Sequence, residues 1–493
     1  MRPGLVLAAA AVSASLVSCG PKPGVSVSPA EALRVDSKSP LDIPFRLSGQ
    51  KSLDVAAFVA LFPENQRPTY AAATFDGRSG ATVVTDVAFP DPDGAGPRTG
   101  WIARRAELYG VDLEATRRIS QAPRDKAAAH IAMFRKVRLF DIAPTTEGAP
   151  TYTLGALELD GVKARPGALA PAAEETRPPD GAQILDSIIV GGVYAKAMSL
   201  RPASNGGSTF ALTIPDFRLA GFGGGKLEGV LLKNPEYRIT RTKESRAREA
   251  LAMGPQAAFL FAGPLGDFLA PLDQRVVAAS FEWRRLDMSG WVAKSLRGET
   301  LGFSDRDQIR LGSIRARDIS TYVGAKRALR STEATAEANS FAGVVPMQVA
   351  LDSKADLYDF TAYLADSEKA AIDILRKHKL DAVKGKSAAS WRWDPDGGPA
   401  GLSVSFDADR LADFLFAFDL ADAKAAKIDA ARAAGARADI FSVAAFKGMK
   451  ITIADKALLS TLFEVSALRS GRSAGDLRKE APEQLRALAA ATP

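Results

Sequence analysis

The chain has 493 residues, of which 46% are hydrophobic and 25% charged, and its formal net charge is +7. These proportions are those of a globular protein, and after the first 18 residues no apolar run approaches the ~20 residues of a membrane span. A single cysteine excludes an internal disulfide, and with only two histidines it argues against a zinc or haem site.

The first 18 residues have the pattern of a secretory signal peptide, with a positive start and an uncharged apolar run over residues 5–16. Leu16-Val17-Ser18-Cys19 then resembles the lipobox of bacterial lipoproteins. The resemblance implies cleavage before Cys19 and lipid on its thiol, which anchors the protein to a membrane of the cell envelope. The absence of an aspartate after Cys19 favours the periplasmic face of the outer membrane, with the inner membrane as the alternative.

Residues 19–44 are expected to consist of the lipidated Cys19 followed by an extended tether. Five prolines are spread among serine, glycine and lysine between Gly20 and Pro44. Proline removes backbone donors and stiffens the chain. Such a segment would hold the folded part away from the bilayer.

Several segments alternate apolar and polar residues with the period of half-buried strands. Phe281 and Trp283 alternate with polar or charged residues, and so do Met449, Ile451 and Ile453. Two hairpins are predicted around turn-forming loops, one between residues 70–75 and 81–87 and the other between residues 390–393 and 402–406. Several strands end in an aspartate, which suits a turn or a helix N-cap.

Helices are predicted to be few and rich in alanine. The segments expected to be helical are 53–62, 113–121, 243–253, 367–379, 421–434, 456–470 and 483–490. The sequence therefore predicts an α+β fold, predominantly antiparallel β-sheet with short helices at strand ends. A mainly β region is expected over residues 45–330, interrupted by a proline-rich loop at 144–180. A mixed α/β region is expected over 345–493. The polar segment 331–340 is expected to separate the two regions, as a less distinct boundary than the proline-rich loop.

The C-terminal unit consists of strand Met449–Ala454, Asp455, helix Lys456–Ser470 and a final helix. It resembles the closing unit of uncharacterised proteobacterial envelope proteins built from repeated strand-and-helix segments. The resemblance covers under a tenth of the chain and implies an envelope protein of unknown activity. A broader comparison is with AsmA-like lipid-handling envelope proteins, whose long curved sheets carry acyl chains, although no motif of this chain establishes that similarity.

Four motifs that suggest chemistry lack the context they need. Residues 471–475 match GxSxG, but a helix precedes the serine and both histidines come earlier in the chain. Residues 48–51 match SxxK without its companion motifs. Residues 221–226 lack the spacing of a phosphate-binding loop. The DPDG segments at 91–94 and 394–397 have glycine and proline where a calcium loop does not. All four are interpreted as turns or links.

Three residue clusters leave alternatives open. Asp407, Asp409 and Asp413 lie near a strand end, where they either serve a glycan or cell-wall hydrolase or cap helices. Trp391-Arg392-Trp393 is either a platform that stacks on sugars or lipid head groups, or cross-strand packing. The basic segment Phe134–Phe140 either contacts anionic head groups or forms the outer face of a strand.

The favoured hypothesis is a lipid-anchored, non-enzymatic envelope protein that binds a lipid or an envelope partner. Its membrane contact is the lipid on Cys19, and neither cofactor nor metal nor catalytic residue is assigned. Nucleic acid is not expected as a partner, because the positive charge is spread along an exported chain. The alternatives are a hydrolase using Asp407 or Asp409 as its acid, and a structural scaffold of an envelope assembly.

Overall fold

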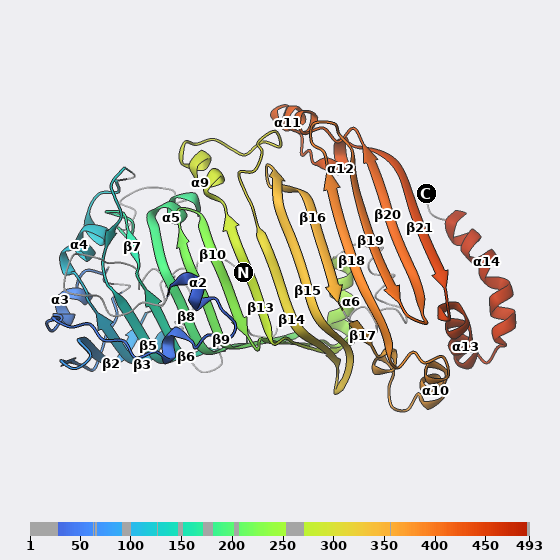
Figure 1. The fold of residues 1–493 in the computed structure, drawn as a ribbon, viewed down its shortest axis with the longest axis horizontal. Helices are drawn as coiled ribbons and strands as arrows, with labels where there is room; N and C mark the ends of the chain where they lie inside the picture. The colour runs from blue at the N-terminus through green and yellow to red at the C-terminus, as the bar shows by residue number, and fades with distance from the viewer. Residues whose placement is uncertain are drawn as a thin grey trace.

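The strands of the described chain form one antiparallel β-sheet of 21 strands. The computed structural model describes residues 28–490 except 63, 65–66, 91–99, 126, 146–150, 171–180, 202–206, 253–270 and 355. Strands close in sequence are also neighbours in space, so the chain runs steadily from one end of the sheet to the other (Figure 1). The expected α+β fold, dominated by antiparallel sheet with short helices, is confirmed.

The main path of the sheet consists of strands that each pair with the next one named. In order, they are β1 (Ala72–Asp76), β2 (Ala81–Phe89), β3 (Trp101–Tyr109), β5 (Lys136–Pro144), β6 (Thr151–Asp160), β8 (Ile188–Arg201), β9 (Thr209–Gly223), β10 (Lys226–Lys233), β13 (Ser280–Asp287), β14 (Gly312–Val323), β15 (Lys326–Ala342), β16 (Val345–Lys354), β18 (Val383–Trp393), β19 (Ala400–Ala408), β20 (Ala412–Ala421) and β21 (Ala445–Asp455). Both predicted hairpins are present, as β1–β2 and β18–β19.

Five shorter strands complete the sheet beside this path. β11 (Glu236–Thr240) and β12 (Asp273–Val277) pair between β9 and β14, and β17 (Asp356–Tyr358) pairs with β15 and β18. β4 (Ile131–Ala132) and β7 (Lys163–Ala164) pair next to β8. Within the described residues, β1 and β21 each pair on one side only and form the two edges of the sheet.

The helices connect strands and lie mainly at strand ends (Figure 1). They are α2 (Pro29–Ala32), η1 (Pro40–Asp42), α3 (Val55–Val59), α4 (Leu113–Gln121), α5 (Gly181–Ser187), α6 (Lys243–Ala252), α9 (Ser289–Leu296), η3 (Phe360–Tyr363), α10 (Lys369–Lys377), α11 (Ala425–Ala433), α12 (Ile440–Val443), α13 (Leu458–Ser470) and α14 (Ala474–Ala490). Every predicted helix has a counterpart, and α4 has the expected bounds. The predicted final helix starts earlier than expected, at Ala474, and includes Pro482.

Aspartates at predicted strand ends have two different roles in the structure. Asp112 caps α4, because its side chain accepts a hydrogen bond from the backbone N–H of Ala115 at 3.0 Å. Asp141 and Asp318 instead lie inside β5 and β14 with φ values of 52° and 49°. Aspartate tolerates this left-handed conformation better than most residues. It therefore lets a strand deviate locally without ending.

The sheet is continuous where the sequence suggested boundaries. β15 runs through the polar segment 331–340 and pairs with β14 and β16 on its two sides. β6 runs through the middle of the expected loop at 144–180 and pairs with β5 and β8. Neighbouring strands supply the hydrogen bonds that hold these segments extended, although their own composition is weak for strand formation.

Residues 28–47, which we call the N-terminal strap, pack against one face of the sheet (Figure 1). The extended tether expected up to residue 44 is therefore replaced, from residue 28 on, by a docked segment. Ala32 and Leu33 are buried, and Leu33 packs on Ala220 and Leu231. The remainder of the expected tether, the signal peptide and Cys19 lie outside the described residues.

Arginine side chains of the sheet bind the strap by donating hydrogen bonds to its backbone carbonyl oxygens. Arg218 is fully buried, and it donates to the carbonyl oxygens of Ala32 at 2.9 Å and Ser37 at 3.0 Å. Its charge is balanced by Asp216, at 2.6 Å. Arg138 donates to the carbonyl oxygen of Ile43 at 2.9 Å. Buried carbonyls of an irregular segment need such donors, so these side chains determine where the strap lies.

We predict that Arg218→Ala destabilises the protein and releases the strap. Removing one partner of a buried ion pair costs about 3–5 kcal/mol, so urea denaturation should show a free energy of unfolding lowered by that amount. Because the strap would be released, trypsin should cleave faster after Arg34 and Lys38. Arg376→Ala is the control, because its contact with Asp373 is 4.0 Å long and exposed, and it should change stability by about 0.5 kcal/mol or less. Equal losses for the two variants would show that Arg218 does not hold the strap.

Candidate functional site

One face of the sheet carries a row of side chains from β1 to β21 that is apolar at every position but one. Because side chains alternate between faces along a strand, residues paired directly across neighbouring strands share a face. Following one line of direct pairs gives Phe75, Thr82, Leu108, Val137, Leu159, Val193, Leu219, Val230, Trp283, Ile314, Ala336, Leu351, Ala389, Val404, Phe416 and Ile451. Only Thr82 is polar. We call this row the apolar row and its face the apolar face.

The residues that precede or follow the apolar row by one position in each strand also form a line of direct pairs. Their side chains lie on the opposite face of the sheet and are mostly polar or charged. It consists of Thr74, Val83, Glu107, Arg138, Glu158, Tyr194, Arg218, Leu231, Glu282, Arg315, Thr335, Asp352, Ala388, Ser405, Leu415 and Thr452. Ion pairs cross between its strands, such as Arg138–Glu158 at 2.7 Å. The strap packs on this polar face, which leaves the apolar face on the other side of the sheet.

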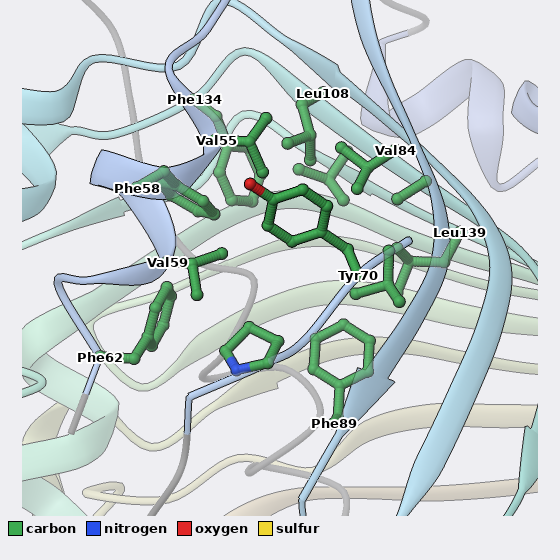
Figure 2. A pocket seen from close by; sticks show the side chains of 14 residues that line it. Val55, Phe58, Val59, Phe62, Tyr70, Val84, Phe89, Leu108, Phe134 and Leu139 are labelled. Atoms are coloured by element: carbon green, nitrogen blue, oxygen red, sulfur yellow. The ribbon is translucent and has the colours of Figure 1, made fainter. Parts of the chain in front are cut away.

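The N-terminal end of the apolar face is closed by packing. Phe58 and Val59 of α3, with Phe62 just after it, lie over Val84 and Leu139 of the sheet (Figure 2). The enclosed space is only about 60 Å³ and its lining is apolar. This end of the sheet therefore has an ordinary hydrophobic core, too tightly filled to hold a large ligand without rearrangement.

The C-terminal part of the apolar face is open. From β8 on, the members of the apolar row are half-buried or exposed, with exposed fractions of 44% at Leu351 and 55% at Ile451. At the other end of the row, Val137 and Leu159 are buried. Large apolar side chains that remain exposed together are unusual on a soluble surface and mark a place where something binds.

Aromatic side chains border this open strip near the two ends of the strands. At one end, Phe441 of α12 lies 6.4 Å, ring to ring, from both Trp391 and Phe418. At the other end, Tyr358 packs edge-on against Phe406 at 5.2 Å. The open strip is thus flanked by apolar rings, and its interior contains Val404 and Phe416.

The carboxylate cluster has the wrong environment for a hydrolase. Asp407 and Asp413 face each other across β19 and β20 on the polar face. Lys456 binds Asp413 at 2.5 Å, which holds the pKa of that carboxyl below its usual value. A general acid needs a raised pKa. Asp409 is exposed and 3.9 Å from Arg410, so these side chains form a surface charge network instead of a pair facing one cleft.

The other motif candidates lie where the sequence interpretation placed them, in turns and links. Residues 471–473 join α13 to α14 and residues 474–475 begin α14, while residues 224–225 form the turn between β9 and β10. In the turn at 394–397, the Asp394 carboxylate accepts hydrogen bonds from the backbone N–H groups of Asp396 and Gly397. The segment 91–94 lies outside the described residues.

Two aromatic or basic candidates are used in packing. Trp393 is buried and donates to the carbonyl oxygen of Ala423 at 2.7 Å, which does not suit a sugar-stacking platform. Lys136 and Arg138 are also buried, where they pair with Glu158. They therefore cannot contact head groups at the surface, and the expectation of an exposed basic face on this strand is wrong.

Among the residues that the structure describes, there is no group of three or more His, Cys, Asp or Glu side chains that could hold a metal ion. His130 contacts the Asp186 carbonyl oxygen at 2.8 Å, and His378 contacts Glu464 at 3.0 Å. The described helices include none long and apolar enough to span a membrane.

Sequence reasoning did not identify the apolar row, although its signal was present. Single strands showed the alternation, but the row depends on the register between strands, and register comes only from the pairing. Comparison of the chain with protein-family models, curated proteins and solved structures finds no match. The geometry of the sheet is therefore the basis for a functional proposal.

Proposed function

We propose that this protein binds the acyl chains of lipids along its apolar face, without catalysing a reaction, while anchored in the cell envelope through Cys19. The observation that carries the proposal is the apolar row, which crosses the whole sheet with Thr82 as its one polar member and is half-buried or exposed from β8 onward. An acyl chain has no hydrogen-bonding groups, so a surface without charges is the surface that suits it.

The free energy available from this contact is large. Each methylene moved from water to an apolar environment contributes about 0.8 kcal/mol, so a chain of a dozen methylenes gains on the order of 10 kcal/mol before ordering costs. Neighbouring strands lie about 4.8 Å apart, which makes the row roughly 70 Å long. A row of this length offers space for more than one chain.

A protein partner is the second candidate, because a large exposed apolar surface without an enclosed pocket also suits a scaffold. The two candidates differ in what should be bound to the protein. An acyl ligand should bind a purified, isolated chain, whereas a scaffold needs its partner protein. The hydrolase alternative has no support from the carboxylates, since Asp407 and Asp409 are exposed and lie 3.8 Å from Lys456 and 3.9 Å from Arg410.

Replacing Phe416 with arginine should weaken acyl binding, because a charge beside the chain would have to lose its hydration. We expect the dissociation constant of a fluorescent fatty acid to rise roughly tenfold or more. Ala417→Arg is the matched control, since it adds the same charge one residue away on the polar face. The affinity of this variant for the fatty acid should stay within about twofold of that of the unmodified chain. Equal effects of the two variants, or no binding to the unmodified chain, would contradict the proposal.

The proposed anchor can be tested by the mass of the protein isolated from membranes. Lipidation at Cys19 predicts a mass equal to residues 19–493 plus acyl chains, and Cys19→Ala should remain unprocessed and carry no acyl chain. A processed chain of ordinary mass without lipid would mean that the exported protein diffuses freely.

A further inference from the structure

The exposed apolar side chains of this protein are concentrated at the C-terminal edge of the sheet. Large exposed hydrophobic residues in the described chain are Phe75, Val344, Leu351, Phe441, Phe446, Met449, Ile451, Ile453, Leu459, Leu462 and Leu468. All but the first three belong to residues 441–468. The opposite edge strand, β1, contributes only Phe75, so the two ends of the sheet differ.

Five of these side chains form what we call the edge patch: Phe441, Phe446, Met449, Ile451 and Ile453. Their exposed fractions are 50% or more. Met449, Ile451 and Ile453 pair with Phe418, Phe416 and Phe414, which places them on the apolar face. Phe441 touches the same face through Phe418. The edge patch is therefore the end of the apolar face, continuous with the proposed acyl-binding surface.

Positive charge accompanies the edge patch. Lys447 and Lys450 lie on β21 between the apolar residues, and both are exposed. Within the described part of the chain they take part in no ion pair, whereas Lys456 just beyond the strand binds Asp413. Apolar side chains combined with free lysines are the combination by which surface segments bind anionic membranes.

The apolar area also continues past the strand. Leu459, Leu462 and Leu468 of α13, which follows β21, are 46–51% exposed. Pairing of β21 with a strand of a second copy would not cover this helix. A bilayer surface can contact both the strand and the helix, so the distribution favours a membrane over a second copy.

We propose that this C-terminal edge docks on a bilayer with anionic head groups, so that acyl chains enter the apolar face directly from the leaflet. The inference rests on the proposed function, because it assigns the end at which lipid enters. A chain moving from the leaflet onto the edge patch would remain in apolar surroundings and would avoid the cost of crossing water.

The test is flotation with lipid vesicles, using the chain without residues 1–19, so that neither the apolar signal segment nor an acyl anchor contributes. Vesicles of phosphatidylcholine mixed with phosphatidylglycerol should carry this protein upward. The variant Met449→Thr/Ile451→Thr/Ile453→Thr should weaken the binding roughly tenfold to a hundredfold. Threonine retains strand propensity, and a denaturation curve checks that the variant is folded.

Val344→Thr is the matched control, because Val344 is 59% exposed but lies in the turn between β15 and β16. It should float like the unmodified chain. Lys447→Glu/Lys450→Glu should lose binding to the anionic vesicles while it still binds the fluorescent fatty acid, since neither lysine belongs to the apolar row.

Flotation that is unchanged by the triple Thr variant, or reduced as much by Val344→Thr, would overturn the docking proposal. The docking proposal would also be overturned if the triple Thr variant lost self-association, measured by sedimentation, while its flotation stayed unchanged. The edge would then bind a second copy of the protein. Fatty-acid binding by the unmodified chain without flotation would refute docking alone. Flotation without fatty-acid binding would refute the proposed function.

Discussion

Alternation of side chains along paired antiparallel strands is the constraint on which this structure depends. A shift of one residue in any strand would move its apolar side chains to the opposite face. The apolar row stays on one face from Phe75 to Ile451, although β-bulges occur in several strands on the way. The pairing therefore converts weak alternation in single strands into one surface that extends over the sheet.

The polar face depends on the same alternation and provides much of the internal support. Arg138 and Arg218 lie on it, and they bind both carboxylates and the carbonyls of the N-terminal strap. The strap thus covers the polar face, while α3 closes only the N-terminal end of the apolar one. The result is a sheet with a packed end and an open end, and this asymmetry gives the proposed lipid path a direction.

The sequence predicted those elements whose own residues determine their conformation. Strong alternation near Trp283 and Ile451 identified strands, and Asp112 marked the start of α4. The segment 331–340 was not recognised because its alanines, glutamates and Asn339 have little strand preference, and its two neighbours hold it in β15. The strap was interpreted as a tether because its prolines suggest an extended chain, whereas its position comes from arginines distant in sequence. The proposed acyl-binding surface could be found only from the register between strands, which no single segment contains.

Site-specific photo-crosslinking to lipid tests the central claim most directly. A photoactivatable amino acid would be placed singly at Leu402, Ser403, Val404, Ser405 and Phe406 of β19, and the protein irradiated in native membranes and analysed by mass spectrometry. The account predicts lipid adducts at 402, 404 and 406, on the apolar face, and none at 403 and 405, on the polar face. Adducts at all five positions, or at none, would contradict the assignment of the apolar face as the acyl-binding surface.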